Sequence, residues 1–174
     1  MLQEFVEEIR KMISKGLKDI HTAFPGEIVS FDEKTGHATI KPKMVFRTPS
    51  GATIEYPALS GVPVLFQQGN GGRSVIAFPV KPGDGCLVII AEQSLDYWLS
   101  GQVTNSDLSF DLTNAVCIPG LATAPNPIVA EACKSNAVLI QHGKNWLKIN
   151  NDGVEIEGNV TVNGDLSVSG TVNK

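Results

Sequence analysis

The chain contains little of what several common classes of protein need. Its 14 Lys and Arg residues stand against 18 Asp and Glu residues, which gives a net charge of −4 at pH 7 and argues against a surface that binds nucleic-acid phosphates. No run of about 18 apolar residues occurs, so we expect no membrane-spanning helix. The first residues are acidic and amphipathic, and they lack the basic start and apolar core of a signal peptide. We therefore expect a soluble protein made in the cytoplasm.

Residue patterns that would carry chemistry are also missing. His21, His37 and His142 lie far apart in the sequence, and no His or Cys pair has the spacing of a zinc site. The Gly-rich stretch 69–72 is followed by neither Gly-Lys-Ser/Thr nor a helical pattern, so it does not predict a phosphate loop. No Gly-x-Ser-x-Gly motif occurs. We therefore expect no catalytic residue, no metal site and no cofactor.

Cysteine and aromatic residues are scarce, whereas glycine and proline are common. Seventeen Gly and ten Pro against 6% aromatic residues predict many turns and short strands. Two of the three cysteines, Cys86 and Cys117, lie in the apolar runs GCLVII and AVCIPG. Buried, reduced thiols are the simplest interpretation, and they fit synthesis in a cytoplasm.

The C-terminal end contains a long alternating pattern. From Val154 to Val172 every even position is Val, Ile, Leu or Gly, and every odd position is polar. Strict alternation predicts an extended chain with one apolar face and one polar face. Glycines at 158, 164 and 170 divide the segment into hexads. The side chains of the apolar face are Val154, Ile156, Val160, Val162, Leu166, Val168 and Val172.

This segment is too long for an ordinary strand. Strands average about 5–6 residues, and a straight chain of this length would reach roughly 60 Å, so we expect bends at the glycines or an elongated structure. Burial of the seven apolar side chains would contribute about 1.5–3 kcal/mol each, but ordering about 20 residues costs about 1–2 kcal/mol each. Because one chain alone does not balance that cost, we interpret the segment as part of an intertwined homotrimeric β-helix. A long β-hairpin arm and a solenoid edge are the alternatives.

Residues 2–20 are predicted to form an amphipathic helix. Apolar residues recur at three- and four-residue steps, and Glu residues lie early while Lys residues lie late, as the helix dipole prefers. We expect the apolar stripe to pack on the body of its own trimer or on a partner protein above it, although part of it also fits a short coiled-coil seam. The residues assigned to the stripe that faces the partner are Leu2, Phe5, Val6, Ile9, Ile13 and Leu17.

The residues after the helix are predicted to form short strands. Pro25-Gly26 is expected to end the helix, and turn signals then separate five apolar segments. Five strands without helical crossovers predict a small antiparallel barrel of the OB type. An additional small hairpin is expected between residues 45–48 and 52–56. The five predicted strands are Glu27–Phe31, His37–Lys41, Val62–Phe66, Ser74–Phe78 and Gly85–Ala91.

The remaining segment is predicted to connect the barrel to the tail. Residues 101–136 show little periodicity and are expected to form a packed connector, whereas 137–141 and 146–150 flank a predicted hairpin turn. The apolar phase shifts from odd to even positions at Asn151-Asp152-Gly153, as a turn or bulge would cause. The predicted fold is therefore mainly β. We divide the chain into an N-terminal helix (1–24), an OB-fold domain (25–121), a connector with a β-hairpin (122–152) and a β-helix segment (153–174).

A series of short phrases lies in a fixed order within residues 25–121. They are PGEIVSFD at 25–32, GVPV at 61–64, FPV at 78–80, PGD at 82–84, EQSLDYW at 92–98, FDLTNAV at 110–116 and IPG at 118–120. Together with the hexad tail, these phrases resemble the central spike proteins of contractile phage tails and of related tail-like bacteriocin particles.

The resemblance implies a mechanical role. In that family an N-terminal OB domain meets the baseplate hub or tail tube, and a C-terminal triple-stranded β-helix forms a needle that pierces the cell envelope when the sheath contracts. This role needs no catalytic residue. For this chain it implies a homotrimer within a virion or tail-like particle, synthesised in the bacterial cytoplasm, with the helical stripe facing the hub or the tail tube.

The sequence departs from the family at its C-terminal end. Some relatives end in a tip where His-x-His motifs from three chains hold an iron ion, but this sequence has no His beyond His142. The resemblance therefore implies a separate tip protein at the C-terminal end of the trimer.

Two other classes of function stay open. An OB-fold nucleic-acid-binding module with an oligomerisation tail would stack bases on Tyr97 and Trp98, although the basic groove that should accompany them is missing. Some spike relatives carry a lysozyme domain, but this chain has no room for one.

Overall fold

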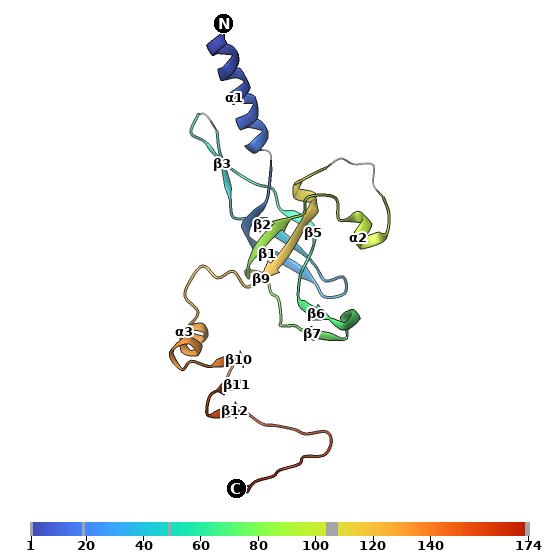
Figure 1. The fold of residues 1–174 in the computed structure, drawn as a ribbon, viewed down its shortest axis with the longest axis vertical. Helices are drawn as coiled ribbons and strands as arrows, with labels where there is room; N and C mark the ends of the chain where they lie inside the picture. Colours follow the sequence, from blue (N-terminus) through green and yellow to red (C-terminus); the bar gives the residue numbers. More distant parts are fainter. Residues whose placement is uncertain (1, 19, 49, 104–107, 173–174) are drawn as a thin grey trace. The chain divides into compact units, whose positions relative to one another are not determined.

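The computed structural model describes residues 2–18, 20–48, 50–103 and 108–172. The chain divides into two compact units, Met1–Thr123 and Ala124–Lys174. Each unit has sheets of its own (Figure 1). No helix within the described ranges is both long and apolar enough to cross a membrane.

The predicted N-terminal helix is confirmed as α1, which spans Leu2–Lys18. The expectation that Pro25-Gly26 ends this helix is wrong, because strand β1 (Ala23–Asp32) already contains both residues. Gly26 lies in the strand for a packing reason: a Cβ atom added there would lie 2.6 Å from Cγ2 of Ile40. The absence of a side chain therefore lets the neighbouring strand pack closely.

The first unit is built on one five-stranded antiparallel sheet with the order β5-β2-β1-β8-β9. The sheet curls into a half-barrel, and its two edge strands approach each other. The Leu65 N–H donates a hydrogen bond to the Cys117 carbonyl at 2.8 Å, and Val64 forms a parallel bridge with Cys117. The other four strands are β2 (His37–Pro42), β5 (Leu59–Pro63), β8 (Gly85–Ile90) and β9 (Ala115–Pro119).

The core of this unit lies on the inner face of the sheet. Alternate residues of β2 and β8 are buried, as the two-residue period of a strand requires. The most completely buried large side chains are Ile28, Ile40, Val88, Cys86 and Cys117. The prediction that Cys86 and Cys117 are buried free thiols is confirmed.

The strand membership of the sheet differs from the prediction. Strand β9 lies inside residues 101–136, which were expected to form a packed connector. The predicted strand Ser74–Phe78 corresponds to β7 (Ser74–Ile76), which pairs with β6 (Gln67–Gly69) in a separate exposed hairpin. The prediction missed β9 because this strand joins the sheet by pairing with β8, which lies far from it in the sequence. A five-residue apolar run does not indicate which distant strand it will pair with.

Two short helices also lie within the predicted connector, the 3-10 helix η2 (Leu112–Asn114) and α3 (Pro127–Lys134). Two more lie before it, the 3-10 turn η1 (Asn70–Gly72) and α2 (Asp96–Ser100). The N-terminus of α3 carries a clear signal, because the Asn126 side chain accepts a hydrogen bond from the Ile128 N–H at 2.9 Å and Pro127 follows it.

The small hairpin expected around residues 49–51 is confirmed as β3 (Val45–Arg47) and β4 (Thr53–Glu55). Pro49 itself lies outside the described residues. An ion pair ties this hairpin to β2, because Nζ of Lys41 lies 2.8 Å from Oε2 of Glu55.

The second unit contains α3 and a three-stranded antiparallel sheet in the order β10-β11-β12 (Figure 1). The predicted hairpin is confirmed as β10 (Val138–His142) and β11 (Asn145–Asn150). The predicted turn at 151–153 leads into β12 (Gly153–Glu157), which pairs with β11. The Asn150 side chain stabilises this turn by accepting hydrogen bonds from the Asp152 and Gly153 N–H groups, at 2.9 and 3.1 Å.

Beyond β12 the described tail, residues 158–172, contains no strand in this single chain. The backbone bends at 158, at 163–164 and at 169–170. Gly158 and Gly164 have φ values of 131° and 149°, which favour glycine. The bends therefore follow the six-residue spacing of the glycines.

Candidate assembly interface

The seven predicted core residues of the tail are all exposed in one chain. Their exposed fractions run from 50% for Val168 to 73% for Leu166. In the single chain, these seven apolar side chains therefore have no covering layer among the described residues. Exposed apolar groups that gather into a patch typically mark an interaction site in a folded protein.

The apolar stripe of α1 is exposed as well. Phe5, Val6, Ile13 and Leu17 are between 41% and 64% exposed, and Ile9 is partly buried. The side chain of Leu2, the sixth predicted stripe residue, lies outside the described part of the structure. The stripe is therefore available for a partner, as an amphipathic helix on a single chain requires.

In the second unit, exposed apolar residues also occur upstream of Val154, the first residue of the predicted tail core. Val138, Ile140 and Ile149 are each more than 40% exposed, although they were predicted only as parts of a hairpin. Apolar residues at alternate positions, 138 and 140 in one strand and 147 and 149 in the next, were present in the sequence. That these residues share one face of the sheet follows only from the strand register.

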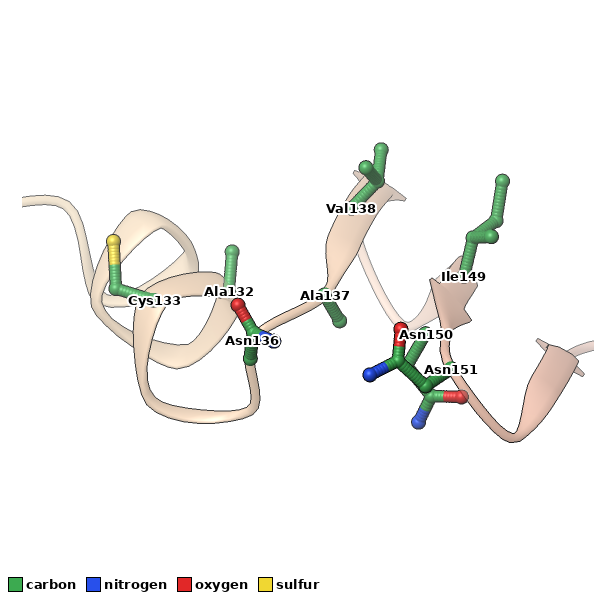
Figure 2. A pocket seen from close by; sticks show the side chains of 8 residues that line it. All are labelled: Ala132, Cys133, Asn136, Ala137, Val138, Ile149, Asn150 and Asn151. Carbon is green, nitrogen blue, oxygen red and sulfur yellow. The ribbon is translucent and has the colours of Figure 1, made fainter.

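An open hollow of about 590 Å³ lies beside this sheet, between α3 and the adjoining ends of β10 and β11 (Figure 2). Figure 2 shows Val138 and Ile149 pointing in the same direction. The lining residues include the exposed thiol of Cys133 but no His, Asp, Glu, Lys or Arg. The hollow therefore offers no acid–base pair for catalysis. Its lining residues are Ala132, Cys133, Asn136, Ala137, Val138, Ile149, Asn150 and Asn151.

The perturbed ionisable groups of the structure have structural roles. The hydrogen bond between Lys41 and Glu55 lowers the pKa of the Glu55 carboxyl and raises the pKa of the lysine. Hydrogen bonds from Thr113 lower the pKa of Asp111. The hydrogen bond with Cys86, followed by burial, raises the pKa of the Cys117 thiol. Within the described ranges no group of three or more His, Cys, Asp or Glu side chains is placed to hold a metal ion.

Exposed apolar segments such as the tail and the α1 stripe typically mark sites of interaction with another molecule. The chain belongs to the family of phage proteins that contain the phage protein Gp138 N-terminal domain. The family model matches residues 24–120, which is 97 of the 174 residues and runs from β1 to the end of β9. A comparison with curated proteins found no match.

Proposed function

We propose that the protein is the structural central spike of a contractile tail baseplate and that it works as a homotrimer. The observation that carries the proposal is the tail face, in which seven alternating apolar side chains are each at least 50% exposed in one chain. Membership in a phage protein family supports this role.

The amount of exposed surface supports a partner of considerable size. The chain exposes 14011 Å², whereas two separate compact units with the lengths of these two would together expose about 9,800 Å². Much of the excess comes from elements that bury little by themselves, such as α1 and the tail. Because apolar surface left in water is unfavourable, these elements are completed by other chains.

Three copies of the tail supply the missing layer in this proposal. The bends at six-residue intervals allow each chain to wind around a common axis and to share backbone hydrogen bonds with the next copy. Val, Ile and Leu at even positions turn inward, and Asn, Thr, Ser, Asp and Glu at odd positions turn outward. Threefold identity closes the oligomer, and intertwining makes unfolding slow and resistant to force.

The half-barrel forms the wider base of the spike. Its strand order β5-β2-β1-β8-β9, together with the parallel bridge between Val64 and Cys117, matches the order of an OB-fold barrel, and we assign that fold to it. The α1 stripe faces the baseplate hub or the tail tube. A separate tip protein sits at the C-terminal end, and the spike helps to pierce the target cell envelope when the sheath contracts. This work is mechanical and needs no catalysis and no cofactor.

The mass of the protein in solution tests the trimer. We expect sedimentation equilibrium to give three times the chain mass of 18.6 kDa. The substitution Val162→Asp places a charge in the trimer interior and is expected to abolish the trimer, since an unpaired buried charge costs several kcal/mol. Thr161→Asp, on the outward side, is the matched control and should remain trimeric. A trimeric Val162→Asp protein with an unchanged melting temperature would contradict the β-helix.

The position in the particle tests the spike assignment. Antibody labelling of intact particles that contain the protein is expected to mark the baseplate. Labelling of the head or along the sheath would overturn the assignment, even if the protein were trimeric.

A further inference from the structure

The strand register of the second unit places six apolar residues on one face of the β10-β11-β12 sheet. Val138 pairs with Ile149, which pairs with Val154, and Ile140 pairs with Leu147, which pairs with Ile156. Because residues directly opposite each other share a face, the two rows form one surface. We call it the sheet face, and it consists of Val138, Ile140, Leu147, Ile149, Val154 and Ile156.

The opposite side of the same sheet is largely polar. One row consists of Leu139, Lys148 and Glu155, and the other of Gln141, Trp146 and Glu157, so four of these six side chains are polar. A sheet with one polar side and one apolar side commonly packs its apolar side against another layer and leaves its polar side in water. The polar side is suited to water, and the sheet face is not.

Within the described residues of the second unit, most of the sheet face is left uncovered. Five of its six side chains are more than 40% exposed, with Ile140 at 64%, and Leu147 is partly buried. In Figure 2, Val138 and Ile149 point together away from the backbone of the sheet. A three-stranded layer with one apolar face needs a second layer to be stable.

Along the sequence, the even-numbered apolar positions of the sheet face continue into the predicted core of the tail. Val154 and Ile156 belong to both sets, and the even-numbered phase persists past the bend at Gly158 to Val160 and Val162. Whatever covers the tail therefore reaches the sheet face at β12. Identical copies of this chain meet that requirement, because each brings the same paired rows in the same order around a threefold axis.

We infer that the β10-β11-β12 sheets of three copies form the walls of one continuous trimer interior, which extends upstream from the tail to Val138. The sheet faces point toward the threefold axis, and the row containing Lys148 and Glu155 points to solvent. This inference rests on the proposed trimer and adds four residues to its interface: Val138, Ile140, Leu147 and Ile149.

The area of the combined face is large enough for such an interface. Six sheet residues and five further tail residues, nine of them at least half exposed, offer about 500 Å² of apolar surface per copy. A standard stable interface buries about 800 Å² per partner, of which about 65% is apolar in homodimers.

A pair of neighbouring substitutions tests the inference in the full chain. Ile140→Asp changes the sheet face, and Gln141→Asp changes the adjacent residue on the opposite side of β10. In one chain Ile140 is already 64% exposed, so an aspartate there is tolerated unless another copy covers it. We expect Ile140→Asp to reduce the mass measured by sedimentation to that of one chain, and Gln141→Asp to keep the trimer.

Cysteine labelling gives a second readout without introducing a charge. In a Cys133→Ser background, which removes the exposed native thiol, Ile140→Cys is expected to react with a thiol reagent at least about 10-fold more slowly than Gln141→Cys because neighbouring copies block access. Buried Cys86 and Cys117 remain unlabelled in both proteins.

The outcomes separate this inference from the proposed function. A trimer in which positions 140 and 141 label at the same rate, or in which Ile140→Asp is as stable as Gln141→Asp, would overturn the inference and leave the trimeric tail intact. A wild-type protein that is monomeric would overturn the proposed function itself.

Discussion

Gly26 shows how a single residue sets the packing of the half-barrel. A Cβ atom at this position would lie 2.6 Å from Cγ2 of Ile40, 3.1 Å from Sγ of Cys86 and 3.2 Å from Cγ2 of Val88. These neighbours are fully buried and come from strands on both sides of β1. Interiors packed at this density do not admit an extra methyl group without displacement of side chains.

We expect Gly26→Ala to lower the free energy of unfolding by about 1–3 kcal/mol because it overpacks the core. Denaturant unfolding followed by circular dichroism, at one chain concentration, measures the change. Gly69→Ala is the matched control, since Gly69 has an extended φ of −157° and no atom within 4 Å of the added Cβ. Equal destabilisation by the two substitutions would show that the close packing around Gly26 is not the cause.

At the scale of elements, the entry into β9 depends on a local cap. Oδ1 of Asp111 accepts hydrogen bonds from the Thr113 N–H at 2.9 Å and from the Thr113 hydroxyl at 2.6 Å. This cap begins η2, which leads directly into β9. Strand β9 in turn supplies the edge that meets Leu65, so the cap supports the curl of the sheet.

We expect Asp111→Ala to cost about 0.5–1 kcal/mol at pH 7, as the loss of an exposed cap does. The side-chain hydrogen bond from Thr113 lowers the pKa of Asp111 below its ordinary value of 3.8. The stabilisation is therefore present above that value and is lost as pH falls through the lowered pKa. Melting temperatures measured from pH 7 to acid should converge for wild type and variant.

Asp111→Asn separates the charge from the hydrogen bond. The asparagine keeps an oxygen that can accept a hydrogen bond from the Thr113 N–H, but its side chain does not titrate. The difference in melting temperature between Asp111→Asn and Asp111→Ala should therefore not change with pH. A gap between wild type and Asp111→Ala that stays constant into strong acid would contradict a role for the ionised carboxylate.

At the scale of the whole molecule, charge distinguishes a spike from a nucleic-acid-binding barrel. Trp98 and Tyr97 on α2 are 85% and 69% exposed and could stack bases. The chain nevertheless carries a net charge of −4, and phosphate contacts supply most of the affinity of non-specific binding.

We therefore expect no binding of single-stranded DNA at about 50 mM salt with up to about 100 μM protein, a range in which non-specific DNA-binding proteins do bind. Fluorescence anisotropy of a labelled oligonucleotide measures this. Binding that weakens as salt rises, and that is lost in Trp98→Ala, would favour the nucleic-acid-binding alternative.

Much of the local structure could be predicted from short-range patterns. The period of the apolar residues in α1 and the turn chemistry between β10 and β11 were sufficient, because each depends on neighbours a few residues away. The same reasoning wrongly predicted that Pro25-Gly26 ends the helix. The dipeptide has the composition of a turn, but it lies inside β1, where Gly26 allows the neighbouring strand to pack closely. The same reasoning also missed β9, whose strand character depends on its pairing with β8.

The candidate interface was predicted in part for the same reason. The apolar face from Val154 to Val172 follows from the two-residue period alone, since the face of each residue depends only on its position in the segment. Val138, Ile140 and Ile149 do not follow from it, because two turns separate β10 from the tail and Ile149 lies at an odd position. Only the register across β10, β11 and β12 aligns odd-numbered and even-numbered residues on one surface.

The sequence by itself determined that this protein has an amphipathic N-terminal helix and a C-terminal segment with one apolar face, because local periodicity sets both. The tertiary structure decided which distant segments share a sheet: it joined β9 to β8, brought Leu65 to Cys117 and placed the rows of β10, β11 and β12 on one side. The physical reason is that backbone hydrogen bonds between strands set register across turns and long connections, and the order of residues along the chain does not contain that information in any local pattern.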